Sequence, residues 1–165
     1  MWRSKVVPVV LTILAASIAS THALLVCTSP TGRLNEASVV VAGTLQDLSV
    51  RTQDEVDYTT GVIHVIAVFR GDVAPGDTLR VQWTNSTHLS CPRKGASHAL
   101  DTLALWMLDP PNGTTFIGGY HCDAIVLDPQ SKSTQGLRTA LQEASSRNEL
   151  AEHSLLVKEF VDGLF

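Results

Sequence analysis

Hydrophobic residues cluster along the first half of the chain in short, β-branched runs. The run over residues 38–50 has a valine-rich core too short for an independent helix, and a longer run covers residues 56–69 with Gly61 inside it as a bulge or bend. Apolar and polar residues alternate over residues 78–83, as in a half-buried strand. The pattern predicts three strands, with polar residues 51–55 as the first connecting loop.

The second half of the chain changes from strand to helix periodicity. An apolar block at residues 100–108 predicts a central strand, and residues 109–113 give a hairpin-type turn signal. Residues 114–120 predict a fifth strand, which residues 122–127 continue. After Pro129 the apolar positions recur every three to four residues, which predicts one broken helix or two short ones. These positions are Leu137, Leu141, Ala144, Leu150, Leu155, Leu156, Phe160 and Val161.

Five short strands followed by helix predict a mainly β fold with a C-terminal helix. A five-stranded, OB-fold-like barrel is the leading arrangement. A β-sandwich is the alternative, less favoured because seven strands are usual there. We expect one domain over residues 24–128, followed by a helical segment over residues 129–165.

The N-terminal region has the pattern of a secretory signal peptide. Basic residues precede an uncharged apolar run over residues 6–19, which is shorter than a membrane-spanning helix requires. Small residues at the positions that signal peptidase reads predict cleavage after Ala23, with Ala19 and Ser20 as alternatives, so we expect residues 1–23 to be removed. A lipoprotein signal ending at Cys27 is disfavoured because Val26 is not small. We therefore expect a secreted or periplasmic protein without a membrane span.

The net charge of the mature chain excludes some classes of binding partner. Removal of residues 1–23 leaves ten basic and 16 acidic residues, a net charge of −6. No basic run remains that would displace the counterions of a nucleic acid or attract an anionic membrane. We therefore expect a protein partner and no nucleic acid.

Three cysteines, Cys27, Cys91 and Cys122, remain after cleavage. In an oxidising compartment we expect Cys27 to pair with one of the other two. Either bond closes a long loop, worth roughly 4 kcal/mol in the chain-entropy model. Three buried free thiols are the alternative.

The sequence gives no pattern for a catalytic or metal site. The five histidines after residue 23 lack zinc-site spacing. His88, Cys91 and His98 share one loop and His121 adjoins Cys122, so the alternative is a metal site assembled by folding, which is disfavoured because a disulfide explains the cysteines better. No nucleophile motif is present, so we expect no enzymatic activity, no cofactor and no metal. A hydrolytic site would have to combine Ser90 or Ser97 with His98 or His121 and with Asp101 or Asp123.

Two asparagines, Asn85 and Asn112, match the N-glycosylation sequon. Both fall in predicted loops. Glycosylation at either position is conceivable only in a eukaryote.

The order of features resembles the netrin-type module, the OB-fold domain of tissue inhibitors of metalloproteinases and their bacterial homologues. The resemblance covers about residues 27–127 and rests on the ordered set of features rather than on one motif. These are Cys27 with Pro30 nearby, residues 37–43 as the first strand, residues 65–71 as a long strand ending in a basic residue and glycine, Ser90-Cys91, residues 103–106, and Cys122.

The resemblance implies a protein-binding module, with metalloproteinase inhibition as the alternative. In the family's inhibitors, the amine and carbonyl of an N-terminal cysteine chelate the protease zinc. The protease-contacting segment would then be Cys27, Thr28, Ser29 and Pro30. Cleavage after Ala23 leaves three residues ahead of Cys27, and Ser29 stands where the family has a second cysteine. Amine chelation would therefore require trimming to Cys27.

Overall fold

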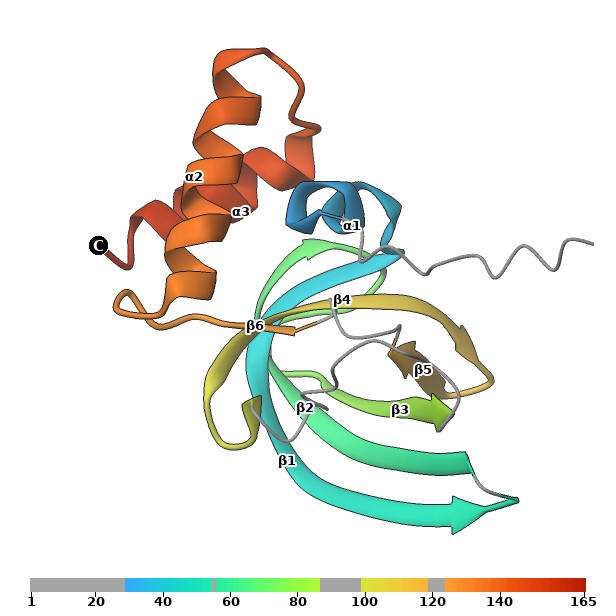
Figure 1. Cartoon of the computed structure of the whole chain (residues 1–165). Coiled ribbons are helices and arrows are strands. Elements are labelled where there is room, and N and C mark those ends of the chain that lie inside the picture. The colour runs from blue at the N-terminus through green and yellow to red at the C-terminus, as the bar shows by residue number, and fades with distance from the viewer. Residues whose placement is uncertain (1–28, 55, 87–98, 119–123) are drawn as a thin grey trace, which may run out of the picture.

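The computed structural model of the protein describes residues 29–54, 56–86, 99–118 and 124–165 (Figure 1). A short helix precedes the strands, and two longer helices follow them, so the mainly β class with C-terminal helices is confirmed. The elements are α1 (Pro30–Glu36), β1 (Val39–Gln53), β2 (Val56–Arg70), β3 (Thr78–Ser86), β4 (Leu103–Asn112), β5 (Thr115–Gly118), β6 (Ala124–Val126), α2 (Lys132–Ser146) and α3 (Glu152–Asp162).

Five of these strands close into a ring. β1 pairs antiparallel with β2 along one edge and with β4 along the other. β2 pairs antiparallel with β3, β3 lies parallel to β5, and β5 pairs antiparallel with β4. β6 pairs with the first half of β4. This closed order is consistent with the expected OB-like arrangement and also with the sandwich alternative.

Two tryptophans occupy the inside of the ring. Trp106 is fully buried, and its indole nitrogen donates a 3.0 Å hydrogen bond to the Gly43 carbonyl oxygen. The rings of Trp83 and Trp106 lie 5.9 Å apart between centroids. A side chain at Gly43 would overlap the backbone of His64, so the glycine allows β1 and β2 to approach closely. The inner core therefore depends on large indoles and on glycine at their contact points.

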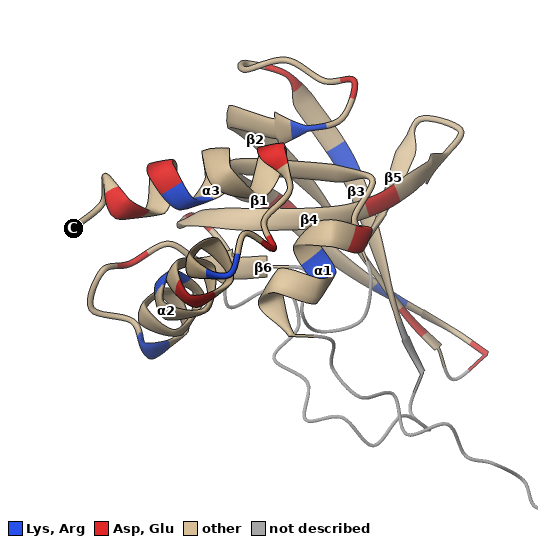
Figure 2. Cartoon of the chain, turned by 90° about the horizontal axis from the view of Figure 1, so that it is seen from above, with Lys and Arg blue, Asp and Glu red and all other residues tan. Residues whose placement is uncertain are grey.

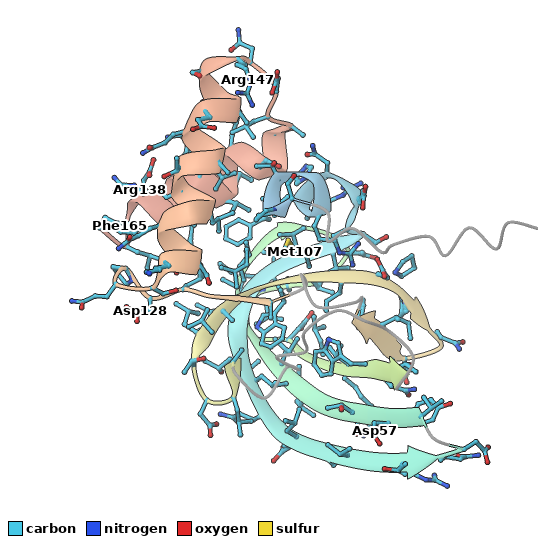
Figure 3. All side chains as sticks on the ribbon, in the orientation of Figure 1. Asp57, Met107, Asp128, Arg138, Arg147 and Phe165 are labelled. Carbon is cyan, nitrogen blue, oxygen red and sulfur yellow. The ribbon has the colours of Figure 1, made fainter. Side chains whose placement is uncertain are left out.

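A second core lies between the outside of the ring and the helices. Neighbouring residues of β1 and β4 alternate between the two cores, because successive side chains of a strand point to opposite faces. Burial on both faces explains the continuous apolar runs of these strands in the sequence. Met107, seen between β4 and the helices in Figure 3, belongs to the outer core. Its other fully buried members include Leu34, Val40, Ala42, Leu105, Leu137, Leu141, Val157 and Val161.

The helix α1 was not predicted from the sequence. Ser29 caps its N-terminus, with the hydroxyl accepting a 3.1 Å hydrogen bond from the backbone N–H of Gly32. Pro30 follows in the first turn, where its missing N–H costs nothing. Arg33 makes a 2.8 Å ion pair with Asp109 of β4. The cap and proline were visible in the sequence as a helix start signal.

The C-terminal end of α1 is held by other elements. Arg70 of β2 donates a 2.9 Å hydrogen bond to the Asn35 carbonyl oxygen. A ring nitrogen of His153 on α3 lies 3.0 Å from the Leu34 carbonyl oxygen. A helix of seven residues is unstable alone, so contacts with β2, β4 and α3 determine that it forms.

The first two strands contain a bulge at Gly61. Two residues of β1, Asp47 and Leu48, face this single residue of β2. Asp47 takes a positive φ of 53°, and Leu48 packs against the inner core. A side chain at Gly61 would overlap Leu45. The predicted irregularity is therefore present, but the extra residue belongs to β1.

Two strands run further than the sequence pattern predicted. Residues 51–53, expected in a loop, continue β1 by pairing with β2. Residues 109–113 were expected to form a turn, but β4 continues through two prolines to Asn112. The register shift between Asp109 and Asn112 leaves both prolines without a paired residue in β5, so their missing N–H groups are tolerated. The chain turns instead at Gly113, with a φ of 65°.

Candidate binding surface

β1, β2 and β3 continue as paired strands beyond the ring. We call this part the ribbon, and it comprises residues 49–53, 56–60 and 84–86. In Figure 1, β1 and β2 curve away together from the helices. No ribbon side chain that the structure describes belongs to either core, and among these side chains only Thr59 is buried. Backbone pairing rather than burial therefore maintains the ribbon.

Side-chain hydrogen bonds fix the register of the ribbon. The hydroxyls of Ser49 and Thr60 lie 2.7 Å apart across β1 and β2. Nearer the tip, the Thr52 hydroxyl donates a 2.6 Å hydrogen bond to the carboxylate of Asp57, which is labelled on β2 in Figure 3. Such cross-strand pairs each add a fraction of a kcal/mol, up to about 1 kcal/mol. The ribbon is therefore an ordered surface before any partner arrives.

The ribbon presents side chains of the kinds that dominate protein interfaces. Arg51 is exposed and lies opposite half-buried Tyr58, which in turn lies opposite Thr84. Arg51 makes no ion pair with any residue that the structure describes. The neighbouring Val50 is 63% exposed. Tyrosine and arginine are enriched at interfaces and at their energetic centres.

One edge of the ribbon is open within the described part of the chain. The first half of β1, residues 39–44, pairs with β4 as well as β2. Leu45 forms a bridge to Leu100, and after the bulge residues 49–53 pair with β2 only, as far as the described residues go. Every second residue of an antiparallel strand points its N–H and C=O away from its partner. Among the described residues, the outward backbone donors and acceptors of residues 49–53 therefore have no strand partner.

The predicted protease-contacting segment is only partly described. Cys27 and Thr28 lie outside the described residues. Ser29 and Pro30 begin α1, and the Ser29 hydroxyl is engaged with the backbone of that helix. A direct contact between a protease and these residues remains a prediction.

The three cysteines and the histidines of the candidate metal and hydrolytic sites also lie outside the described residues. The disulfide between Cys27 and one of its two candidate partners therefore stays a prediction. Within residues 29–54, 56–86, 99–118 and 124–165, no three His, Cys, Asp or Glu residues are grouped to hold a metal ion. The predicted positions outside these ranges are Cys27, Cys91, Cys122, Ser90, Ser97, His88, His98, His121 and Asp123.

The two sequon asparagines lie at the ends of strands rather than in loops. Asn85 is paired within β3, opposite Asp57 of β2. Asn112 is the exposed last residue of β4. The loop prediction was wrong for both because β3 and β4 extend further than their apolar residues.

An ion pair between Arg138 and Asp162 joins α2 to α3. Acidic and basic residues are mixed on both helices in Figure 2. Asp162 accepts a 2.7 Å hydrogen bond from Lys158 and a 3.0 Å bond from Arg138. The Lys158 ammonium lowers the pKa of the Asp162 carboxyl, Arg138 adds to this effect, and burial opposes it. Arg138 and Phe165 are neighbours in Figure 3, and the Arg138 guanidinium lies 4.3 Å from the centre of the Phe165 ring.

Sequence reasoning predicted residues 49–50 and 56–60 of the ribbon as strand but missed residues 51–53 and 84–86. The polar residues 51–53 predict a loop, although Arg51 and Thr52 are compatible with a strand. The length of the following run, residues 56–69, was the available signal. A β-strand of that length needs a neighbour along its whole course, and residues 51–53 provide one.

None of the helices in the described ranges is both long and apolar enough to cross a membrane. In comparisons with known proteins, no family model matches the chain, and no curated protein matches it significantly.

Proposed function

We propose that this chain is an exported, non-enzymatic module that binds a protein partner through the ribbon. The observation that carries the proposal is the continuation of three hydrogen-bonded strands beyond both cores. Ordering a residue costs about 1–2 kcal/mol in backbone entropy. No described side chain of the ribbon offsets this cost by packing into a core. A binding role accounts for retaining such a structure.

The chemistry of the ribbon supports a protein partner. Tyr58 and Val50 offer apolar area, while Arg51 offers a guanidinium without an ion partner among the described residues. The hydrogen bonds of Ser49 and Thr52 preorganise the strands, which reduces the entropy lost on binding. The predicted signal peptide supports a location outside the cytoplasm, and the net charge of −6 expected after its removal argues against nucleic acid.

A site-specific photo-crosslinking experiment tests the proposal. A photoreactive residue replaces Val50 on the ribbon in one version and Leu156 on α3 in a control version. These side chains are 63% and 45% exposed and lie on different elements. We expect a discrete protein adduct from cells of the source organism at position 50 only. Equal adducts at both positions, or none at position 50, would contradict the proposal.

The resemblance to metalloproteinase inhibitors requires a separate assay. Proteins that begin at Leu24 and at Cys27 are titrated against a panel of metalloproteinases and against esterase substrates. We expect no esterase turnover by either form. We also expect no zinc-dependent inhibition by the Leu24 form, because three preceding residues convert the Cys27 amine into an amide. Inhibition by the Cys27 form alone would identify a latent inhibitor, and turnover would refute a non-enzymatic role.

A further inference from the structure

We propose that the open edge of β1 binds an extended acidic-apolar segment of the partner as an additional strand. This inference rests on the proposed function and specifies the binding mode. Backbone donors and acceptors along residues 49–53 would give the affinity, and flanking side chains would give the specificity. The segment differs from the earlier part of β1, where β4 takes the same edge.

Within the described residues, the edge carries only part of the usual protection against strand addition. Proteins often guard edge strands with charged side chains, proline or a bulge. Residues 49–53 contain no proline and one charged side chain, that of Arg51, and the bulge at Asp47 and Leu48 lies before them. The described residues include no helix packed over this segment. The edge is therefore competent to pair with an incoming strand.

The side chains beside the edge define the partner sequence. Adjacent residues of a strand point to opposite faces, so Val50 and Arg51 flank the incoming strand on different sides. Val50 lies on the face shared with Thr59 and favours an apolar neighbour. Arg51 lies on the face shared with Tyr58 and favours a carboxylate. An extended segment with alternating apolar and acidic residues satisfies both positions.

A second copy of this chain fits the edge less well. Within residues 49–53, Arg51 is the single charged residue. Antiparallel pairing of two such edges centred on Arg51 opposes two like charges, and the nearest carboxylate, that of Asp54, lies beyond the end of β1. Like charges directly opposite each other destabilise a strand pair. Charge complementarity thus favours a different, acidic partner.

Synthetic peptides test the binding mode directly. The first peptide alternates valine and glutamate, the second replaces glutamate with lysine, and the third carries N-methyl groups on alternate backbone amides of the first. Amide hydrogen exchange at residues 49–53 is followed by NMR in the mature protein. We expect rapid exchange at the outward amides in the free protein and at least about tenfold slowing with the glutamate peptide. The lysine peptide should bind about tenfold more weakly, and the methylated peptide should not bind.

A matched pair of charge reversals tests the side-chain assignment. Arg51→Glu should reverse the preference between glutamate and lysine peptides. Arg80→Glu makes the same charge change at an exposed position of β3 outside the ribbon, and should leave the preference unchanged. Equal effects of both variants would overturn the assignment of Arg51.

Three outcomes would overturn strand addition itself. These are slow exchange of all residues 49–53 in the free protein, equal binding of the methylated peptide, and peptide protection confined to other strands. A partner crosslinked at position 50 together with any of these outcomes would leave the proposed function supported and this binding mode refuted. Concentration-dependent self-association that protects the same amides would identify a second copy as the occupant and also refute the proposal.

Discussion

Gly118 lies against the indole ring of Trp83 at the end of β5. A side chain there would overlap the Trp83 ring nitrogen and its neighbours. Since the indole is 7% exposed and packed inside the ring, it has little room to move. We expect Gly118→Ala to lower the free energy of unfolding by about 3 kcal/mol, as overpacking of a core does.

The control for this prediction is Gly136→Ala in α2. A Cβ at Gly136 would meet no neighbouring atom, and alanine favours helix. Urea denaturation should show a gain of about 0.5–1 kcal/mol for this variant. Unchanged stability of Gly118→Ala would contradict the position assigned to Trp83.

Two buried hydroxyls on the helices differ in their hydrogen bonds. Ser154 on α3 is 1% exposed, and its hydroxyl has no partner among the described residues. Thr134 on α2 donates a 2.6 Å bond to the Val126 carbonyl oxygen and accepts a 3.1 Å bond from the Asp128 backbone N–H. Burial of an unpaired hydroxyl is costly, so Ser154→Ala should stabilise the protein by about 1 kcal/mol.

Thr134→Val should have the opposite effect on stability. This substitution preserves the side-chain shape but removes both hydrogen bonds, and should cost about 1–3 kcal/mol. Thermal denaturation monitored by circular dichroism measures both variants. Destabilisation by Ser154→Ala would mean that the Ser154 hydroxyl has a partner.

The ion pairs of Asp162 with Lys158 and Arg138 depend on the ionisation of its carboxyl. Its pKa is lowered in the folded protein, mainly by Lys158. A lowered pKa stabilises the folded state fully above the ordinary value of 3.8, and this contribution disappears as the pH falls through the folded pKa. Stability should therefore decline below about pH 4, and Asp162→Asn should reduce that decline at a cost of about 0.5 kcal/mol at pH 7.

Stability measured by urea denaturation between pH 2 and 7 tests this contribution. Ser133→Ala on the exposed side of α2 provides a control that leaves the carboxyl in place. Identical pH profiles for the parent and Asp162→Asn would show that the interaction contributes nothing measurable.

At the scale of elements, the sequence predicted best those strands that bury one or both faces. β2 begins at the predicted residue and ends one residue later because its β-branched run is long and distinct. α2 and α3 follow the predicted three-to-four-residue period at Leu137, Leu141 and Val161, which lie in the outer core. On α3 the prediction of Leu155 and Leu156 was wrong, because both are exposed and Val157 is buried instead. These elements were predictable because their buried faces require apolar residues at regular spacing in the sequence.

Elements held by tertiary contacts were only partly predictable from local pattern. Ser29 and Pro30 give a local start signal for α1, but its last turn is held by Arg70 and His153, which bind its carbonyls from far away in sequence. Residues 51–53 form a strand because β2 is long enough to pair with them. Part of the candidate surface was missed for the same reason, since an exposed ribbon has no apolar periodicity.

At the scale of the whole molecule, two buried cores support a ring and its helices, and the ribbon extends beyond both. Because no core residue lies in residues 51–58 as far as they are described, stability and binding should be separable. A shortened protein in which Asn-Gly replaces residues 51–58 tests this separation. The new turn would join Val50 to Thr59, which already face each other in the sheet, and Asn-Gly suits a two-residue hairpin.

Partner binding by the shortened protein is the most direct measurement of the central claim. Its affinity for the partner crosslinked at position 50 is measured by calorimetry beside the parent protein, and both are melted under the same conditions. We predict a melting temperature within about 5 °C of the parent and at least a hundredfold loss of affinity, because the Tyr58 and Arg51 contacts are gone. A folded shortened protein that binds with parental affinity, or a shortened protein that no longer folds, would contradict the claim that the ribbon is a binding surface separate from the cores.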